Sequence, residues 1–250
     1  MKLRILSYNI HKGFSVGNQK FVLSKIRDAL RGVDVDIVFL QEVLGAHDEH
    51  ARTFEDWPLA SQFEFLADQM WPHFAYGKNA IYEAGHHGNA ILSRFPILEH
   101  SNCDISTNSL ERRGILHAGI HIPDLDLKVH CLNVHLNIFG RSRARQLEKL
   151  KERITGFVPS EEPYILAGDF NDWSSRASKL MEDSLGAREV FRSIGGTHAA
   201  TYPSRLPLLK LDRIYVRGFA PQQARVLTGA PWHDLSDHAP IYCDVTLDKL

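Results

Sequence analysis

The stretch Ile165-Leu166-Ala167-Gly168-Asp169-Phe170-Asn171 indicates the fold class, because an apolar run there ends in an aspartate and an asparagine. Short apolar runs bounded by polar residues are typical of buried strands, and we expect a strand at 163–168. The stretch therefore places chemically useful side chains at the C-terminal end of a strand.

The same arrangement recurs along the chain. Polar residues end the predicted strands at 3–10 (Asn9), 35–43 (Gln41 and Glu42) and 127–136 (Asn133 and His135), Asp212 opens a strand at 211–217, and Ser236-Asp237-His238 precedes one at 239–247. A single aspartate or asparagine at a strand end is most often a cap or a turn former. To explain this sequence, separate caps or turns would have to occur at all six of these places. One shared site explains them together.

Helix-like segments alternate with these strands. We expect helices at 19–31, 59–71, 141–158 and 174–184, and further strands at 74–82, 88–94, 97–105, 115–122 and 222–228. The pattern predicts that Asn18 caps the first helix, that Gly32 ends it, and that the helix 141–158 buries Ala144, Leu147, Leu150, Ile154 and Phe157. Apolar strands need cover on both faces, so helices should flank a sheet or a pair of sheets. The polar segment 44–58 is expected to be a loop, as a lid or a substrate loop. No linker composition divides residues 1–250, which indicates one domain.

Composition narrows the classes of function. Of 250 residues, 44% are hydrophobic and 24% are charged, as in ordinary globular proteins, and the formal net charge is −1. Proteins that grip long nucleic acids usually carry a strong basic excess, so this balance counts against a processive nuclease. Three cysteines without paired spacing (Cys103, Cys131 and Cys243) suit a reducing compartment and read as small buried hydrophobes. No signal peptide or membrane span is evident, and we expect a cytoplasmic protein.

The recurrent side chains suit metal-assisted phosphoryl chemistry. Glu42, Asp237 and Asn9 offer the hard oxygen ligands that Mg²⁺ prefers, and Mn²⁺ could replace that ion. Asp169 could orient or deprotonate a water, with Asn171 holding a phosphate oxygen. A carboxylate beside a histidine raises its basicity, so an Asp212–His238 pair could bind the scissile phosphate or stabilise the transition state.

Taken in order, these residues carry a family resemblance. The motifs are Ser7-Tyr8-Asn9-Ile10, Gln41-Glu42-Val43, Gly88-Asn89-Ala90-Ile91-Leu92-Ser93-Arg94, Asn133-Val134-His135-Leu136, Gly168-Asp169-Phe170-Asn171, Leu211-Asp212-Arg213-Ile214 and Ser236-Asp237-His238. The chain resembles the endonuclease/exonuclease/phosphatase superfamily over residues 5 to 245, and it is most similar to short bacterial members that share residues 7–13 and 111–114.

The resemblance implies an α/β fold, a four-layer α/β sandwich with two mixed β-sheets packed face to face and helices outside. It also implies that Glu42 is the main Mg²⁺ ligand, with Asn9 beside it and Asp237 near the ion. Asp169 would activate the attacking water, Asn171 would contact the phosphate, and Asp212 would orient His238. His135 matches a second histidine of the deoxyribonuclease and sphingomyelinase branches, which separates this chain from the abasic-site endonucleases.

Several further residues are open to two interpretations. Arg141, Arg143 and Arg145 could hold a second phosphate, although a solvated helix face is the more frequent explanation. Arg113 could point into the site and bind substrate, or form a structural ion pair. His86 and His87 could line the site, although an exposed turn is slightly favoured. Trp173 and Trp232 could stack on a substrate or close the core, and His11 and Lys12 could line the site.

Three functions remain open at this stage. The first is a phosphodiesterase acting on DNA or RNA. The second, which the neutral charge favours, hydrolyses a phosphate ester of a phospholipid head group or a small metabolite. A non-catalytic binding module is least favoured, because every motif position is intact. We expect a phosphate-ester substrate, no stable membrane insertion and no obligate protein partner.

Overall fold

The computed structural model describes residues 1–109 and 111–248. Its strands are β1 (Lys2–Asn9), β2 (Ile37–His47), β3 (His73–Tyr82), β4 (Gly85–Ser93), β5 (Ile97–Asp104), β6 (Gly114–Ile122), β7 (Leu127–His135), β8 (Tyr164–Asp169), β9 (Arg188–Glu189), β10 (Asp212–Arg217), β11 (Phe219–Val226) and β12 (Ile241–Leu247). Its α-helices are α1 (Leu23–Arg31), α2 (Asp48–Thr53), α3 (Gln62–Ala67), α4 (Gly140–Phe157), α5 (Arg176–Leu185) and α6 (Val190–Gly195).

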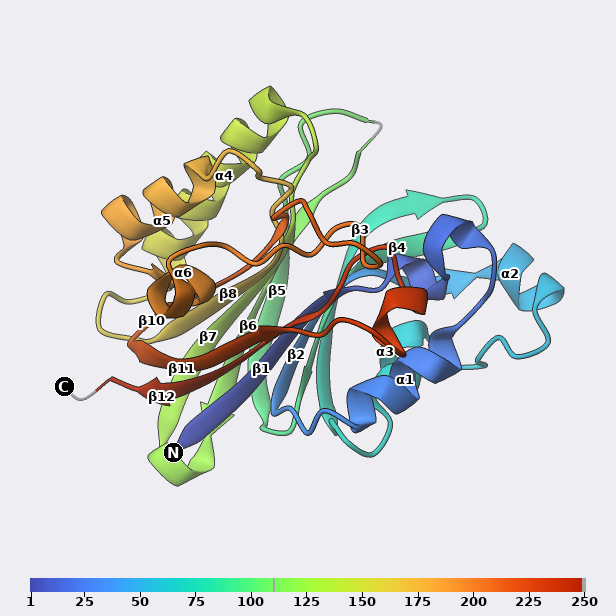
Figure 1. The fold of residues 1–250 in the computed structure, drawn as a ribbon, viewed down its shortest axis with the longest axis horizontal. Helices are drawn as coiled ribbons and strands as arrows, with labels where there is room; N and C mark the ends of the chain where they lie inside the picture. Colours follow the sequence, from blue (N-terminus) through green and yellow to red (C-terminus); the bar gives the residue numbers. More distant parts are fainter. Residues whose placement is uncertain (110, 249–250) are drawn as a thin grey trace.

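The strands form two six-stranded mixed sheets. One has the order β11-β12-β1-β2-β4-β3 and the other β5-β6-β7-β8-β10-β9. Each sheet has a parallel pair at its centre, β1 with β2 and β7 with β8, and antiparallel neighbours around it. The C-terminal ends of the two parallel pairs meet at the upper end of the molecule in Figure 1.

Three apolar layers hold the sandwich together. Side chains of both sheets, including Ile5, Phe39, Cys131 and Ile165, form the core between them. A second cluster joins the outer face of the first sheet to α1 and α3, and a third joins the outer face of the second sheet to α4 and α5. Figure 1 shows these helices on the two outer sides. The predicted four-layer sandwich is confirmed.

The inner face of the central strands changes from apolar to polar along its length. Because side chains alternate across a strand, every second residue faces the opposite sheet. The inward residues run Leu3, Ile5, Ser7, Asn9 in β1; Ile37, Phe39, Gln41 in β2; Val129, Cys131, Asn133, His135 in β7; and Ile165, Ala167, Asp169 in β8. The core therefore occupies one end of the sandwich, and polar side chains fill the other.

The segment 44–58 differs most from the prediction of a loop. β2 continues to His47 and pairs with β4 up to Gly85, and α2 follows at once. The pairing of β2 with β4 has register shifts between Leu40 and Val43 and between Leu44 and Ala46, so His47 ends a bulged strand, and the polar residues that follow it are in α2.

The helix predictions need smaller corrections. The helix expected at 59–71 is shorter, Gln62–Ala67, and Val22, not Asn18, stands at the N-cap of α1, which Gly32 ends as predicted. In α4, Ala144 and Phe157 are exposed, whereas Arg143 and Gln146 are buried. The short elements β9 and α6 were not predicted.

Two of the three cysteines, Cys131 and Cys243, are buried as predicted, and Cys103 is partly exposed. None of the helices in the described part of the chain is long and apolar enough to cross a membrane.

Candidate active site

Backbone pairing brings the predicted site residues to one end of the sandwich. Asp169 at the end of β8 pairs with His135 at the end of β7 and with Asp212 at the start of β10. His238 lies just before β12, which is antiparallel to β1, so its loop returns to the end of β1 at Asn9. The shared position follows from strand direction, because all these residues lie at the upper ends of their strands.

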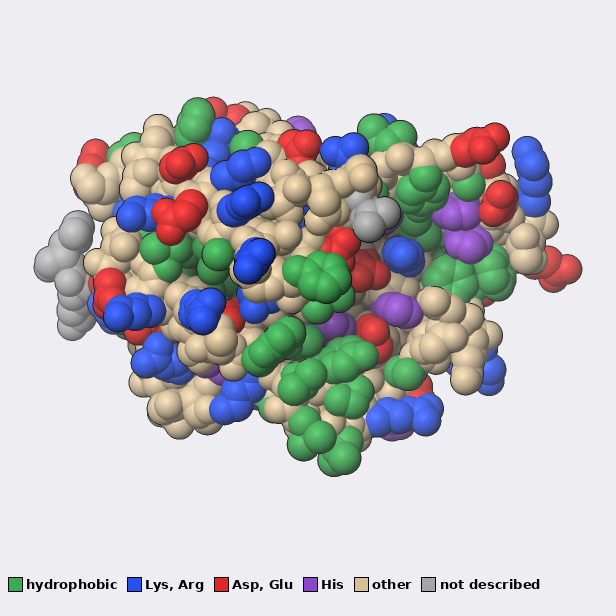
Figure 2. All heavy atoms as spheres, turned by 90° about the horizontal axis from the view of Figure 1, so that it is seen from above, with side chains coloured by type: hydrophobic (Ala, Val, Ile, Leu, Met, Phe, Trp, Pro, Cys, Tyr) green, Lys and Arg blue, Asp and Glu red, His purple; other side chains and the backbone are tan. Residues whose placement is uncertain are grey.

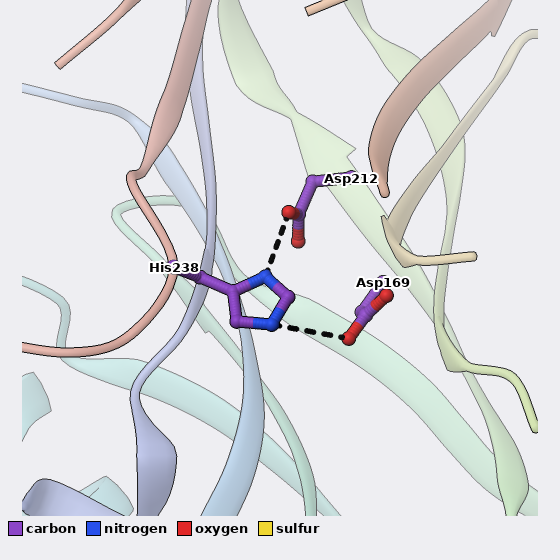
Figure 3. A group of neighbouring side chains, drawn as sticks. All are labelled: Asp169, Asp212 and His238. Carbon is purple, nitrogen blue, oxygen red and sulfur yellow. Dashed lines mark hydrogen bonds and ion pairs between the residues drawn. The ribbon is translucent and has the colours of Figure 1, made fainter. Parts of the chain in front are cut away.

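Asp169 is at the centre of the site. Its Oδ2 lies 3.4 Å from His135 Nε2 and 3.7 Å from His238 Nε2, and Asn9 Nδ2 donates to the same oxygen at 3.3 Å. Its Oδ1 accepts the backbone N–H of Asn171 at 2.9 Å. These contacts fix the carboxylate between two imidazole rings, and Figure 3 shows it facing His238.

His238 connects Asp169 to Asp212. Its Nδ1 lies 2.9 Å from Asp212 Oδ2, an oxygen that also accepts the Thr201 hydroxyl at 2.5 Å. This arrangement places the second ring nitrogen, Nε2, toward Asp169 (Figure 3). The Asp212–His238 pair predicted from sequence is thus present, with both side chains buried.

Burial and charge set the protonation of this group. Burial disfavours the charged imidazole of His238, but the carboxylates of Asp212 and Asp169 outweigh it and raise the pKa of His238 above its ordinary value. Burial also raises the pKa of Asp169, against the opposing charge of His238. His238 is therefore an imidazolium at neutral pH and can donate a proton or a hydrogen bond.

His135 has the opposite character. Burial lowers the pKa of His135 well below its ordinary value, and repulsion from Arg113, His238 and His87 adds to the effect. The ring is neutral, so the site combines one charged and one neutral imidazole around a single carboxylate.

A second acidic group lies across from this cluster. Glu42 has a positive φ of 55° and lies within the shift in register between Leu40 and Val43. The His11 ring lies between the two carboxylates, with Nδ1 3.3 Å from Asp237 and 3.9 Å from Glu42. Asn9 Oδ1 accepts the backbone N–H of His11.

These groups fit a divalent cation of the hard type. Glu42 and Asp237 are about one-fifth exposed, and Glu42 accepts no hydrogen bond from any of the described residues. The neighbouring Tyr8 hydroxyl and His11 Nε2 are buried without a hydrogen-bond partner, again among residues the structure describes. Two carboxylates and a carboxamide oxygen form the donor set that Mg²⁺ selects.

Asp169, Asp212 and His238 also lie close enough together to hold an ion. Their geometry argues for proton handling instead. Both ring nitrogens of His238 already face carboxylates, Nδ1 that of Asp212 and Nε2 that of Asp169. The Glu42 side offers oxygen donors that are not engaged in this way.

A buried polar network beneath the site joins the two sheets. The Asn133 amide donates to the carbonyls of Leu40 and Ala90 at 2.9 and 2.8 Å, and its oxygen accepts Gln41 Nε2 at 2.8 Å. Asn89 Nδ2 reaches the carbonyl of Asn133 at 3.3 Å. Asn133 thus holds the strand segment that leads into Glu42.

Basic residues border the site on the β4 and β6 side. Lys12, Arg113 and His87 lie close enough to lower the pKa of His135 by charge repulsion, and Glu42 lies close enough to His87 to oppose the lowering of its pKa. Arg113 lies 3.7 Å from Glu111, which is the structural ion pair considered from sequence. His86 and His87 belong to strand β4, and the favoured exposed turn was wrong.

The arginines after β7 separate in the structure. Arg141 and Arg145 are exposed, as on a solvated helix face. Arg143 is buried, donates to the carbonyls of Asn137 and Ile138, and stacks over Trp173 with 5.1 Å to the ring centroid. Arg143 therefore shapes the loop after His135, and it does not belong to the solvated face.

The remaining predicted residues divide between the site and its supports. Asn171 Nδ2 donates to the carbonyl of Leu136 at 3.0 Å, which leaves one amide proton for a substrate. Trp173 is exposed at the rim, and Trp232 is buried against Tyr8. Sequence reasoning missed Thr201, which lies in no motif, and the role of Ser236, whose hydroxyl donates to the carbonyl of Asn9.

Comparisons with known proteins agree with this geometry. The model of the Endonuclease/Exonuclease/phosphatase family matches residues 6–238. This chain belongs to the endonuclease/exonuclease/phosphatase family. Members of the family hydrolyse phosphoesters and generally depend on divalent metal ions. A family relative, the uncharacterized protein YbhP of Escherichia coli K12, is 45% identical over 244 residues, which are 98% of this chain and 96% of YbhP.

Solved structures of the family share the fold. The endonuclease/exonuclease/phosphatase from Bacteroides vulgatus superposes with a TM-score of 0.78 at 18% identity, over 99% of this chain and 100% of that chain. Humanized D. rerio TDP2 gives a TM-score of 0.74 at 22% identity, over 98% of this chain and 99% of that chain. The sandwich is thus the family's fold, and the chain is a phosphoesterase.

Proposed function

We propose that this phosphoesterase is a Mg²⁺-dependent phosphodiesterase. The observation that carries the proposal is the buried Asp169 carboxylate, which lies between the imidazoles of His135 and His238, with Asp212 on the far side of His238. That arrangement provides a base and an acid that face one space. A base and a separate acid are what the attack of water and the departure of an alkoxide require.

The chain's own residues would divide the work as follows. Asp169 accepts a proton from the attacking water, held in place by Asn9 and Asn171. The His238 imidazolium, held by Asp212, stabilises the charge that develops on the phosphoryl oxygens and can supply the proton for the leaving group.

His135, Asn171 and Arg113 would hold the substrate. His135 is neutral and can donate a hydrogen bond to an unesterified phosphate oxygen, and Asn171 has one amide proton left for another. Arg113 supplies positive charge at the same border.

Glu42, Asn9 and Asp237 would hold the Mg²⁺, whose role when bound is to polarise a phosphoryl oxygen and neutralise developing charge. The support is the chemistry of these three side chains and their position opposite Asp169. Mn²⁺ has the same ligand preference and could replace Mg²⁺.

Hydrolysis of bis-nitrophenyl phosphate and of nitrophenyl phosphate, with Mg²⁺ and with chelator, tests the proposal. We expect Mg²⁺-dependent release of nitrophenol from the diester, and a fall of about 10²-fold or more in the isosteric variant Asp169→Asn. Cleavage of the monoester alone would replace the proposal with a phosphatase of small metabolites. Unchanged turnover in Asp169→Asn would remove that carboxylate from the mechanism.

A further inference from the structure

A short hairpin, residues 202–209, lies beside the site. Its tip carries apolar side chains, and its base contacts His238 and the loop before it. Tyr202 and Leu209 pair through two backbone hydrogen bonds, and the Tyr202 ring lies 5.1 Å from the His238 ring between centroids. Ser204 donates to the carbonyl of Ser236 at 2.6 Å. At the tip, Leu206 and Leu208 are 66% and 67% exposed. The hairpin thus projects leucines into solvent directly beside His238.

Two more loops add exposed apolar side chains at the same end of the molecule. Ile138 and Phe139 follow β7 and its His135, and Trp173 follows β8 and its Asp169. We call these side chains the apolar rim: Ile138, Phe139, Trp173, Leu206, Leu208 and Leu209. Figure 2 looks onto this end and shows hydrophobic side chains gathered beside acidic and histidine side chains. Large apolar groups clustered in water mark an interaction surface.

Positive charge adjoins the apolar rim. α4 and α5 begin at this end, and neither has an acidic residue in its first turn, where acidic residues are usually favoured. Arg141, Arg176 and Lys179 are exposed there, without an ion pair to any residue in the described ranges. Figure 2 shows lysine and arginine side chains on one flank of the hydrophobic band.

We propose that the apolar rim docks the protein on an anionic phospholipid surface. Leucine, phenylalanine and tryptophan at loop tips can enter the interface while nearby cations meet acidic head groups. The inference rests on the proposed function and gives its substrate class, a phosphodiester of a lipid head group presented at the surface. Nucleic acid bases stack on aromatic rings such as Phe139 and Trp173, but they offer no partner for the four exposed aliphatic side chains of the rim, and a small soluble ester requires none.

Co-sedimentation with sucrose-loaded vesicles tests the docking. Vesicles of phosphatidylglycerol mixed with phosphatidylcholine are compared with pure phosphatidylcholine, in chelator so that no turnover occurs. We expect binding to the anionic vesicles that is at least tenfold tighter. The double variant Leu206→Ser/Leu208→Ser should weaken it by about tenfold or more, because each leucine would bury much of its side chain.

The matched control is Leu98→Ser. Leu98 is 60% exposed but lies at the start of β5, at the opposite end of the sandwich, and its replacement should leave vesicle binding unchanged. The double charge reversal Arg141→Glu/Lys179→Glu should weaken binding to anionic vesicles only. Equal binding of the wild type and the leucine variant overturns the docking proposal. Binding that ignores lipid charge, or concentration-dependent dimers in place of vesicle binding, also overturns it.

Turnover of soluble bis-nitrophenyl phosphate keeps this inference apart from the proposed function. We expect the leucine variant to retain that turnover while losing vesicle binding. Loss of both would assign the hairpin to support of His238 and contradict docking. Absence of soluble turnover in the wild type, with vesicle binding intact, would contradict the phosphodiesterase and leave the surface in place.

Discussion

Replacing Asn133 with alanine should destabilise the protein by about 2–4 kcal/mol. The side chain is fully buried and makes three hydrogen bonds, to the carbonyls of Leu40 and Ala90 and from Gln41. Its loss removes the side-chain donor of two buried carbonyls, at about 1–2 kcal/mol each, whereas Gln41 Nε2 keeps the Ser7 hydroxyl and the Phe39 carbonyl as acceptors. Because Leu40 leads into the bulge before Glu42, the same change should weaken Mg²⁺-dependent turnover.

Urea unfolding followed by circular dichroism measures the change in the free energy of unfolding, and we also expect the melting temperature to fall by about 10 °C. Asn102→Ala is the matched control, because exposed Asn102 makes comparable hydrogen bonds to the Lys78 carbonyl and to Asn79. It should cost less than about 1 kcal/mol. A loss of under 1 kcal/mol for Asn133→Ala would refute the claim that this network holds the sheets at the site.

Three further predictions concern catalysis, backbone and pH. His238→Ala should lower kcat for a diester by about 10²-fold or more, and near-normal turnover would exclude His238 from the mechanism. Gly168→Ala should cost more than about 3 kcal/mol by urea unfolding, because Gly168 has φ +145° and an added Cβ would meet the Val134 carbonyl. The control is Gly156→Ala in α4, where an added Cβ has no atom within 4 Å, so this change should be neutral or stabilising. Equal losses of unfolding free energy in the two variants would contradict the clash at Gly168. Burial, with repulsion from His130 and Arg153, lowers the pKa of His117 to about 4. The folded state favours neutral His117, so the free energy of unfolding should fall by at most about 3 kcal/mol as the pH is lowered from 6.5 to 4. His117→Asn should reduce this dependence of stability on pH, and an unchanged dependence in the variant would refute the prediction.

The sequence predicted much of the sandwich, because buried strands and amphipathic helices carry strong periodic signals. Its errors have physical causes. The segment 44–58 is polar like a loop, but its first residues pair with β4 beyond a bulge that no periodicity reveals. Phe157 has helical spacing but is the last residue of α4 and stays exposed, with the Arg153 guanidinium stacked over its ring.

The sequence predicted which residues lie together at this end of the sandwich, since they stand at strand ends and strand direction gathers them. What could not be predicted are contacts made by residues outside the motifs. Thr201 reaches Asp212 only because the hairpin after it folds back on His238. Asn133 was recognised as polar, but its role between the sheets depends on two carbonyls from other strands.

The most direct test of the account is the Mg²⁺ dependence of diester hydrolysis in the wild type and in Glu42→Gln, a variant of nearly the same shape. We predict that chelator abolishes wild-type turnover, that Mg²⁺ restores it, and that Glu42→Gln raises the half-saturating Mg²⁺ concentration at least tenfold, as loss of a charged ligand would. The folded state, checked by thermal unfolding, should stay intact. Turnover that resists chelator, or an unchanged Mg²⁺ response in Glu42→Gln, would contradict the assignment of this site as a metal-dependent phosphodiesterase.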